Sequence, residues 1–373
     1  MSISKEAFTI GVEEEYQIIH PQTRALRSRA QAILSRAQAI IGDRVTPEMY
    51  LSQIEIGTPV CQTLAEVSNA VRHLRGQVIT AARREGSQIV AAGTHPFSHW
   101  EDQKLTPKDR YLDIAANYQQ LTHEQLIFGC HVHVGIPDRE VAIQVMNRAR
   151  HWLAPILALT SNSPFWLGTD TGYSSFRTEI WGRWPLAGIP QVFTDRAEYD
   201  RLVADLVNTG SIADESNIYW DIRPSVHYET LEFRIADVCL TADEAVMIAG
   251  LVRALVRTCA LEVEQNRPMP HVRSEVLRAA QWQAARFGLD NNLIDSQQSR
   301  SVPAQTMIEN LLTYLRPALE EYQEWNDVSS LVQTVLDQGN GATRQRAAYL
   351  RSEMSLEGVV DFMIAETAKG VFL

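Results

Sequence analysis

The chain has 373 residues, of which 45% are hydrophobic and 21% charged, so it can bury a substantial core and no long segment has a disordered composition. A net charge of −11 argues against nucleic acid as a general partner. The longest apolar run, residues 153–159, is too short to cross a membrane, and the first residues lack the features of a signal peptide. The four cysteines are far apart and form no CxxC pair, which with these features predicts a cytoplasmic protein without a membrane partner.

Strand-like and helix-like stretches are interspersed over the first two thirds of the chain, without regular βαβ alternation. Capping-box pairs predict that helices begin after Thr63 and Thr241, because Glu66 and Glu244 follow three residues later. Pro155 predicts a kink or break within its helix. Strands are predicted at 8–19, 50–60, the start of 87–97, 127–136, 217–226 and 228–238, and helices at 28–41, 63–86, 107–126, 139–161 and 241–265.

This order of elements favours an α+β fold with a mostly antiparallel sheet. From residue 271 onward the pattern is helical almost throughout, and no Gly/Ser-rich linker or sharp change of composition divides the chain. We therefore expect a single domain over 1–373, with a helical C-terminal part covering about 241–373. These patterns are compatible with a monomer and with a homo-oligomer.

The first predicted strand, FTIGVEEEYQII at 8–19, carries three consecutive glutamates. Successive side chains of a strand point to opposite faces, so Glu13 and Glu15 share one face while Val12, Tyr16 and Ile18 share the other. Two carboxylates on one face repel each other unless a cation lies between them. Solvent counter-ions, an arginine or a metal ion would each satisfy this requirement.

The same division into one apolar and one polar face recurs in other predicted strands, and lysine is absent from all of them. Carboxylates together with imidazole form the ligand set of a hard divalent ion with mixed oxygen and nitrogen donors. The polar faces carry Gln53 and Glu55, His131 and His133, Asp221 and Arg223, and Thr230, Glu232 and Arg234.

Each group also has a plain structural explanation. Glu13 and Glu15 fit a solvated strand face, His131 and His133 fit hydrogen-bonded structural histidines, and Glu232 with Arg234 fits a cross-strand ion-pair network. The matching phase of all the strands favours a shared site. The chain contains no P-loop, no GxGxxG after a strand, no HExxH and no GxSxG, so a bound nucleotide would be held mainly by metal and arginine.

Several segments of the chain resemble, in the same order, the motif series of the type 2 glutamate–cysteine ligases, also called carboxylate–amine ligases. The resemblance implies a catalytic sheet like that of glutamine synthetase: curved, antiparallel, of about six strands, with the active site on its concave face and helices on its convex face. It also implies that ATP is a co-substrate and that Mg²⁺, or Mn²⁺, is bound. The segments are GVEEEYQ, SQIEIGTPVC, GTHPF, GCHVHVG, SFRTEIWGRWPLAGIP and YWDIRPSVHYETLEFRIADV.

Roles of individual residues follow from the same resemblance. Glu229 departs from it, since the family has a small residue there. His133 is expected to contact substrate or to orient a metal ligand. The resemblance assigns metal binding to Glu13, Glu15, Glu55, His131 and Glu232, the reacting groups to Arg234, Arg223 and His133, ATP binding to Arg177, Arg183 and Arg223, and substrate binding to His95, Gln53 and Arg177.

The implied reaction uses small-molecule substrates: an amino-acid carboxylate, an amine and ATP. Phosphoryl transfer to the carboxylate would give an acyl phosphate, which the amine attacks, and such transfer needs charge neutralisation and positioning above all. The group that takes the proton from the amine stays open among His133, His95, Glu229 and a phosphate oxygen. A two-metal phosphohydrolase built on the same Glu/His cluster is the alternative, and a non-catalytic binding protein is a third reading.

Overall fold

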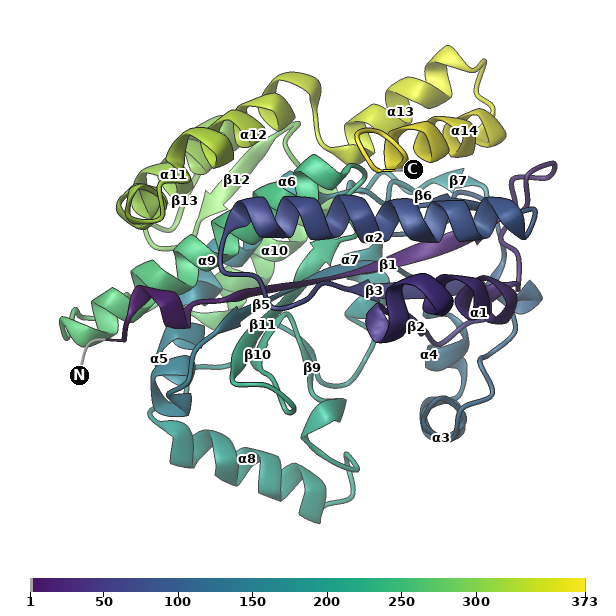
Figure 1. Ribbon diagram of the computed structural model, residues 1–373. Coiled ribbons are helices and arrows are strands. Elements are labelled where there is room, and N and C mark those ends of the chain that lie inside the picture. Colours follow the sequence, from purple (N-terminus) through teal and green to yellow (C-terminus); the bar gives the residue numbers. More distant parts are fainter. Residues whose placement is uncertain (1–2, 373) are drawn as a thin grey trace.

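The computed structural model describes residues 3–372, and a seven-stranded sheet lies at its centre (Figure 1). The strand order is β10-β11-β5-β1-β3-β2, β4 also pairs with β1, and every pairing in this sheet is antiparallel. The predicted α+β fold with a mostly antiparallel sheet is therefore confirmed. The strands of this sheet are β1 Ile10–Ile19, β2 Val45–Pro47, β3 Gln53–Gly57, β4 Gln88–Val90, β5 Gly129–Gly135, β10 Ile222–Pro224 and β11 Thr230–Asp237.

Helices cover the apolar side of this sheet, and most of the C-terminal part is helical, as predicted. The helices are α1 Ala30–Ile41, α2 Leu64–Arg84, α3 Asp109–Tyr118, α4 Gln120–His123, α5 Arg139–Ala149, α6 Leu153–Thr160, α7 Phe176–Trp181, α8 Arg196–Asn208, α9 Ala242–Glu264, α10 Ser274–Phe287, α11 Ala304–Glu321, α12 Trp325–Gln338, α13 Gly341–Arg351 and α14 Leu356–Thr367. Three short strand pairs complete the structure: β6 Phe165–Trp166 with β7 Thr169–Asp170, β8 Ala187–Gly188 with β9 Tyr219–Trp220, and β12 Asn292–Asp295 with β13 Arg300–Pro303.

Two helices begin where the capping pairs predict. The Thr63 hydroxyl accepts a hydrogen bond from the Glu66 amide at 3.2 Å, and Thr241 accepts one from the Glu244 amide at 3.3 Å. Each glutamate carboxylate also accepts from the amide one residue before the cap, at Gln62 and Leu240. Both starts are therefore secured by paired side-chain bonds to otherwise unpaired amides.

Several predictions of secondary structure were wrong in detail, among them the single strand over 217–226, which is divided into β9 and β10 in different sheets. The helix predicted over 139–161 is interrupted by a 3₁₀ turn at Arg150–Trp152, and Pro155 lies in the first turn of α6, where proline is tolerated. The C-terminal part also contains the β12–β13 hairpin, which the helical pattern did not predict.

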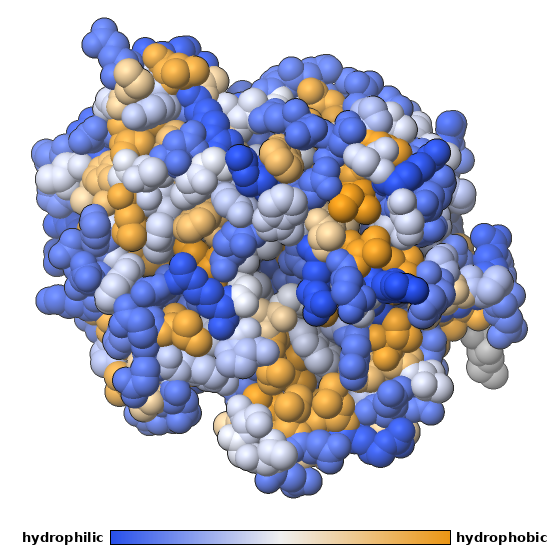
Figure 2. All heavy atoms as spheres, turned by 180° about the vertical axis from the view of Figure 1, so that it is seen from behind, coloured by the Kyte–Doolittle hydropathy of each residue, from blue (hydrophilic) through white to orange (hydrophobic). Residues whose placement is uncertain are grey.

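The two faces of the central sheet have different neighbours. In Figure 1, α2 and α12 lie on one side of the sheet and α3 and α8 on the other. The alternate residues Ile10, Val12 and Tyr16 of β1 are buried within the core that the helices close. Seen from behind, the molecule is hollowed near its middle, and hydrophilic residues border the hollow (Figure 2). No helix within residues 3–372 combines the length and apolarity needed to span a bilayer.

Candidate active site

The registers of the central strands bring the predicted polar residues into one row. Glu13 of β1 lies opposite His131 of β5, and Glu15 lies opposite Glu55 of β3. On the other side of β5, His133 lies opposite Glu232 of β11. Because directly paired residues share a face of the sheet, the four strands β1, β3, β5 and β11 contribute to one polar surface. This surface forms the floor of a cavity of about 430 Å³.

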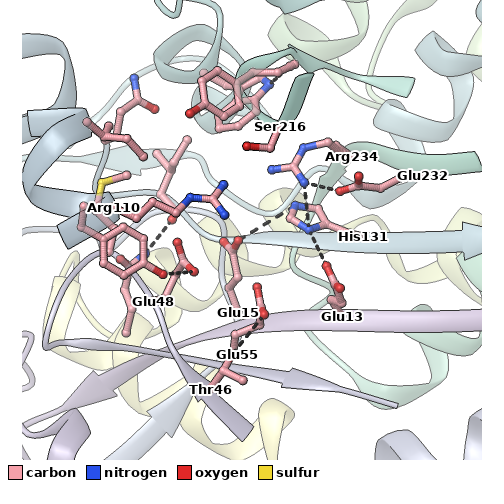
Figure 3. A pocket seen from close by; sticks show the side chains of 18 of the residues that line it. Glu13, Glu15, Thr46, Glu48, Glu55, Arg110, His131, Ser216, Glu232 and Arg234 are labelled. Atoms are coloured by element: carbon pink, nitrogen blue, oxygen red, sulfur yellow. Dashed lines mark hydrogen bonds and ion pairs between the residues drawn. The ribbon is translucent and has the colours of Figure 1, made fainter. Parts of the chain in front are cut away.

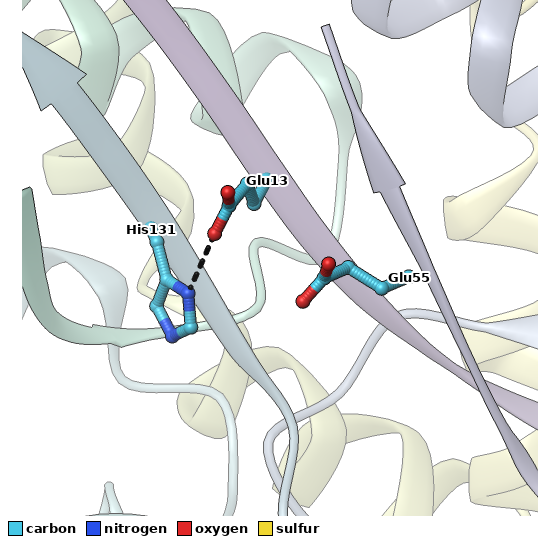
Figure 4. Close-up of side chains that lie close together, drawn as sticks. All are labelled: Glu13, Glu55 and His131. Atoms are coloured by element: carbon cyan, nitrogen blue, oxygen red, sulfur yellow. Dashed lines mark hydrogen bonds and ion pairs between the residues drawn. The ribbon is translucent and has the colours of Figure 1, made fainter. Parts of the chain in front are cut away.

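Glu13 belongs to two groups of side chains that could each hold a metal ion. One group is Glu13, Glu55 and His131, and the other is Glu13, His133 and Glu232; the ligand atoms of each group lie within 4.8 Å of one another. Figure 4 shows Glu13 between His131 and Glu55. The His131 Nδ1 is 3.2 Å from one Glu13 oxygen, and the His133 Nε2 is 3.4 Å from the other. Carboxylate and imidazole donors at this spacing suit two divalent ions that share one carboxylate.

Glu232 lies between two arginines at one end of the row. Its carboxylate accepts a hydrogen bond from Arg223 Nε at 2.8 Å and another from Arg234 Nη1. Burial opposes ionisation, but the charges of Arg234 and Arg223 hold the pKa of Glu232 well below its ordinary value. Glu232 is therefore ionised at neutral pH.

The opposite end of the row has an excess of carboxylates (Figure 3). Burial, with the nearby charge of Glu48, raises the pKa of Glu15 to about 7. Burial and the charge of Glu13 raise the pKa of Glu55 well above its ordinary value. The hydrogen bonds of both carboxylates come from neutral groups. Glu15 accepts from the Gly129 amide at 2.6 Å, and Glu55 accepts from the Thr46 hydroxyl at 3.2 Å. Such an excess of buried acid favours binding of cations.

A third arginine, Arg177 of α7, lies beside the row next to a β-bulge in β11. The register of β11 against β5 shifts between Phe233 and Ala236, which leaves Asp237 opposite Gly129 on the polar face. Asp237 lies 4.0 Å from Arg177 Nη1. A Cβ on Gly129 would come within 2.6 Å of Arg177 Nη2, so glycine is required for the guanidinium to lie against the strand.

The ring of Trp181 packs against both guanidinium groups at this end of the cavity. The Arg234 and Arg177 guanidinium carbons lie 5.3 and 5.8 Å from its ring centre. Both Nε groups are buried and, among residues 3–372, make no hydrogen bond. The two guanidinium groups are thus held on an aromatic face, and both residues line the cavity, where a guanidinium can bind an anionic ligand.

The comparisons with known proteins agree with this geometry. The model of a family described as Glutamate-cysteine ligase family 2 matches residues 9–364. The chain belongs to this family. Its members are ATP-dependent carboxylate–amine ligases, so the expected family and class of enzyme are confirmed.

Relatives of similar length support the assignment to the glutamate–cysteine ligase 2 family. The chain is 40% identical to a protein of Rhodopirellula baltica, with 98% of both chains covered. It is 42% identical to one of Roseiflexus castenholzii, with 98% of this chain and 96% of the relative covered. Both relatives carry glutamate–cysteine ligase 2 as a provisional name.

Two solved structures share the fold. A glutamate–cysteine ligase of Francisella tularensis in complex with AMP gives a TM-score of 0.71 at 11% identity, covering 99% of this chain and 90% of that one. A bifunctional glutathione synthetase of Pasteurella multocida gives 0.70 at 14% identity, covering 98% of this chain and 52% of that one. At these identities the likeness establishes the fold alone.

Two residues that the family resemblance assigned to ATP or substrate do not line the cavity. His95 is fully buried, with Nδ1 accepting from the Phe97 and Ser98 amides and Nε2 donating to the Arg24 carbonyl. Arg183 is not among the residues that line the cavity, and it pairs with Glu124. Both side chains make structural bonds in this structure, and their roles in binding ATP or substrate stay predictions.

Gln53 and His133 line the cavity, but their contacts differ from the roles that the family resemblance implied. Gln53 lines the cavity, but both ends of its side-chain amide already make hydrogen bonds. Its Oε1 accepts from the Tyr50 main-chain amide and its Nε2 donates to the Ile127 carbonyl, so the side chain stabilises β3. His133 was expected to contact substrate or to orient a ligand, and the structure places it within a group that could hold a metal ion. Its Nδ1 lies 3.1 Å from the Thr230 hydroxyl.

Sequence reasoning missed several residues of the cavity, of which Glu48 is the most informative. Glu48 follows β2 in a loop, where no strand alternation marks its direction. The Tyr111 hydroxyl donates to its carboxylate at 3.2 Å. Arg110, Trp181 and Trp184 also line the cavity. All three lie outside the predicted strands, so strand alternation does not mark them.

Proposed function

We propose that the chain joins the γ-carboxylate of glutamate, or a similar carboxylate, to the amino group of cysteine or another amine, with ATP and Mg²⁺ as the preferred metal. Mn²⁺ suits the same donors. The substrate classes come from the family and from the names of the relatives. The observation that carries the proposal is the pair of groups sharing Glu13, because a phosphoryl transfer between two anions requires concentrated positive charge.

In this proposal the acidic and histidine side chains bind metal ions, and the arginines bind anionic groups of the substrates. Glu13, Glu55 and His131 would hold one divalent ion, and Glu13, His133 and Glu232 another, with Glu15 beside the first group. Bound there, divalent ions neutralise phosphate oxygens and bring the carboxylate and ATP together. Arg234 and Arg177 supply donors to phosphate or to the substrate carboxylate, and Arg223 keeps Glu232 ionised and in place.

In the proposed reaction, a substrate carboxylate oxygen attacks the γ-phosphorus of ATP, and ADP leaves. The resulting acyl phosphate is attacked by the amine nitrogen, the C–O bond to phosphate breaks, and inorganic phosphate and one proton are released. The buried arginines stabilise the charge that develops on the transferred group, because they are fixed before the reaction begins.

The test is release of phosphate from ATP in the presence of metal. A ligase releases phosphate only when both the acid and the amine are present, and hydroxylamine traps the acyl phosphate as a hydroxamate. Phosphate release with ATP alone, without hydroxamate, would instead support the two-metal phosphohydrolase.

A further inference from the structure

Asp237 is a fully buried carboxylate at the end of β11, and it does not line the cavity. One of its oxygens accepts hydrogen bonds from the Asn162 amide and the Ser163 hydroxyl, both at 2.7 Å. The other oxygen accepts from the Ser175 hydroxyl at 2.8 Å. These three bonds fix both ends of the segment 162–175, because breaking any of them would leave a buried polar group unpaired.

The same two serines set the start of α7. The Ser163 hydroxyl accepts from the Arg177 amide at 3.0 Å, and the Ser175 hydroxyl accepts from the Thr178 amide at 3.3 Å as the N-terminal cap of the helix. Each serine hydroxyl therefore donates to Asp237 and accepts from the first turn of α7. A single side chain, that of Ser163, connects Asp237 to the main chain of Arg177.

Asp237 also acts on the side chain of Arg177. Its carboxylate lies 4.0 Å from Arg177 Nη1, and no other cation lies this close to Asp237 within residues 3–372. Burial raises the pKa of Asp237, and the charge of Arg177 opposes that rise. The other terminal nitrogen of Arg177, Nη2, donates to the Arg234 carbonyl at 3.2 Å. Arg177 lines the cavity, so its guanidinium is held there by a buried negative charge and a main-chain carbonyl.

Two glycines allow this arrangement. A Cβ on Gly93 would lie 2.8 Å from the Asp237 carboxyl carbon, and one on Gly129 would lie 2.6 Å from Arg177 Nη2. The two glycines open the segments GTHPF and GCHVHVG of the motif series. The backbone thus approaches the acid and its arginine too closely for any side chain, which leaves the pair little freedom to move.

We propose that Asp237 is a positioning residue of the ligase site, which fixes the start of α7 and holds the Arg177 guanidinium in place for an anionic group of ATP or of the substrate acid. This inference rests on the proposed ligase function and adds to it the residue on which that arginine depends. Asp237 itself touches no substrate, because it lies outside the cavity. A guanidinium fixed before the substrate binds loses less conformational entropy and stabilises charge as soon as it develops.

The test is a double-mutant cycle on kcat/KM, measured as amide formation from ATP, acid and amine. Arg177→Gln should raise the KM of the substrate whose anionic group it binds. Asp237→Asn should raise the same KM, by up to about 100-fold, which is the order of cost for a displaced binding group. The other KM values should change much less. In Arg177→Gln protein, adding Asp237→Asn should lower kcat/KM less than about two-fold, because the residue through which Asp237 acts is gone.

Ser163→Ala is a second variant, which keeps the buried charge. It removes the link between Asp237 and the Arg177 amide, so it should raise the same KM by a smaller factor. If Asp237→Asn does not fold, the same cycle is run with Ser163→Ala. Asp361→Asn is the matched control, because it breaks an aspartate–arginine pair whose acid is 52% exposed, and it should leave every KM unchanged.

Full additivity of the two changes in the cycle would overturn the inference, because Asp237 would then act on folding and not through Arg177. A rise in the KM of a different substrate from the one that Arg177→Gln affects would overturn it as well. Wild-type protein that forms neither amide nor hydroxamate would instead overturn the proposed function, and this inference with it.

Discussion

Glu14 forms a buried ion pair with Arg75 on the apolar face of the sheet. In sequence it lies between Glu13 and Glu15, whose carboxylates face the cavity. Arg75 Nε lies 3.3 Å from one Glu14 oxygen, and the Tyr16 hydroxyl donates to the same oxygen at 2.5 Å. Arg75 also donates to the Leu240 and Cys239 carbonyls at 3.1 and 3.0 Å. The three consecutive glutamates therefore have two functions, since the outer two face the site and the middle one ties β1 to α2 and to the segment before α9.

Glu14→Gln should destabilise the protein by about 3–5 kcal/mol, because it leaves the fully buried Arg75 without its counter-ion. The free energy of unfolding from urea titration measures this. Replacing both residues by leucine should cost less than the sum of the single changes. Glu85→Gln, which breaks an exposed pair with Arg36, should cost less than about 1 kcal/mol. Equal costs for Glu14→Gln and Glu85→Gln would contradict this role.

Glu232→Gln should lower kcat about 10²–10³-fold while the protein still folds, with a lower melting temperature because two largely buried arginines lose their shared counter-ion. The change removes a charge from one candidate metal group and leaves Arg223 and Arg234 without their shared partner. An ATP-dependent phosphate-release assay, run beside a thermal melt, measures both quantities. Glu275→Gln, at an exposed position on α10, is the control. Near-normal turnover of Glu232→Gln would count against the site.

His133→Asn should reduce the number of bound Mn²⁺ ions by one, and so should His131→Asn, because each histidine belongs to a different candidate group. The free Mn²⁺ signal in electron paramagnetic resonance titrations measures the stoichiometry. His99→Asn, whose side chain is 51% exposed, should bind as the wild type does. If His133→Asn kept the full stoichiometry, His133 would instead contact substrate, as the family resemblance suggested.

The free energy of unfolding should decrease in acid because the buried ring of His95 resists protonation in the folded protein. Burial lowers the pKa of His95 to about 4, partly opposed by its bond to the Arg24 carbonyl. The unfolded chain takes up this proton below a pH of about 6.5, so the free energy of unfolding decreases as the pH falls toward 4, by at most about 3 kcal/mol from this residue.

Urea titrations of the wild type and His95→Gln test this pH dependence. The stability difference between the two proteins should be larger at about pH 7.5 than at about pH 5, because only the wild type carries the titrating ring. A constant difference across this range would show that His95 does not supply the effect.

The sequence predicted the polar row because strand alternation has a period of two, and Glu13, Glu55, His131 and Glu232 lie within regular strands. The same rule failed where the backbone is irregular. The bulge after Phe233 moves Asp237 to the polar face, and the break between β9 and β10 buries Asp221 against Gln281 instead of leaving it beside Arg223.

Cavity residues outside the strands could not be predicted from strand alternation. Glu48 and Arg110 reach the cavity through tertiary packing of segments that have no strand periodicity, so no local pattern marks them. His95 shows the converse, because this loop histidine was expected to contact substrate, and the structure shows its ring holding main-chain amides outside the cavity. That the chain forms a single domain stays a prediction.

The most direct measurement is an anomalous difference map from crystals grown with Mn²⁺ and a non-hydrolysable ATP analogue. We predict two peaks on the polar face of the sheet, one bounded by Glu13, Glu55 and His131 and the other by Glu13, His133 and Glu232, with the phosphates of the analogue against both. Peaks away from these side chains, or a nucleotide bound without metal at this face, would contradict it.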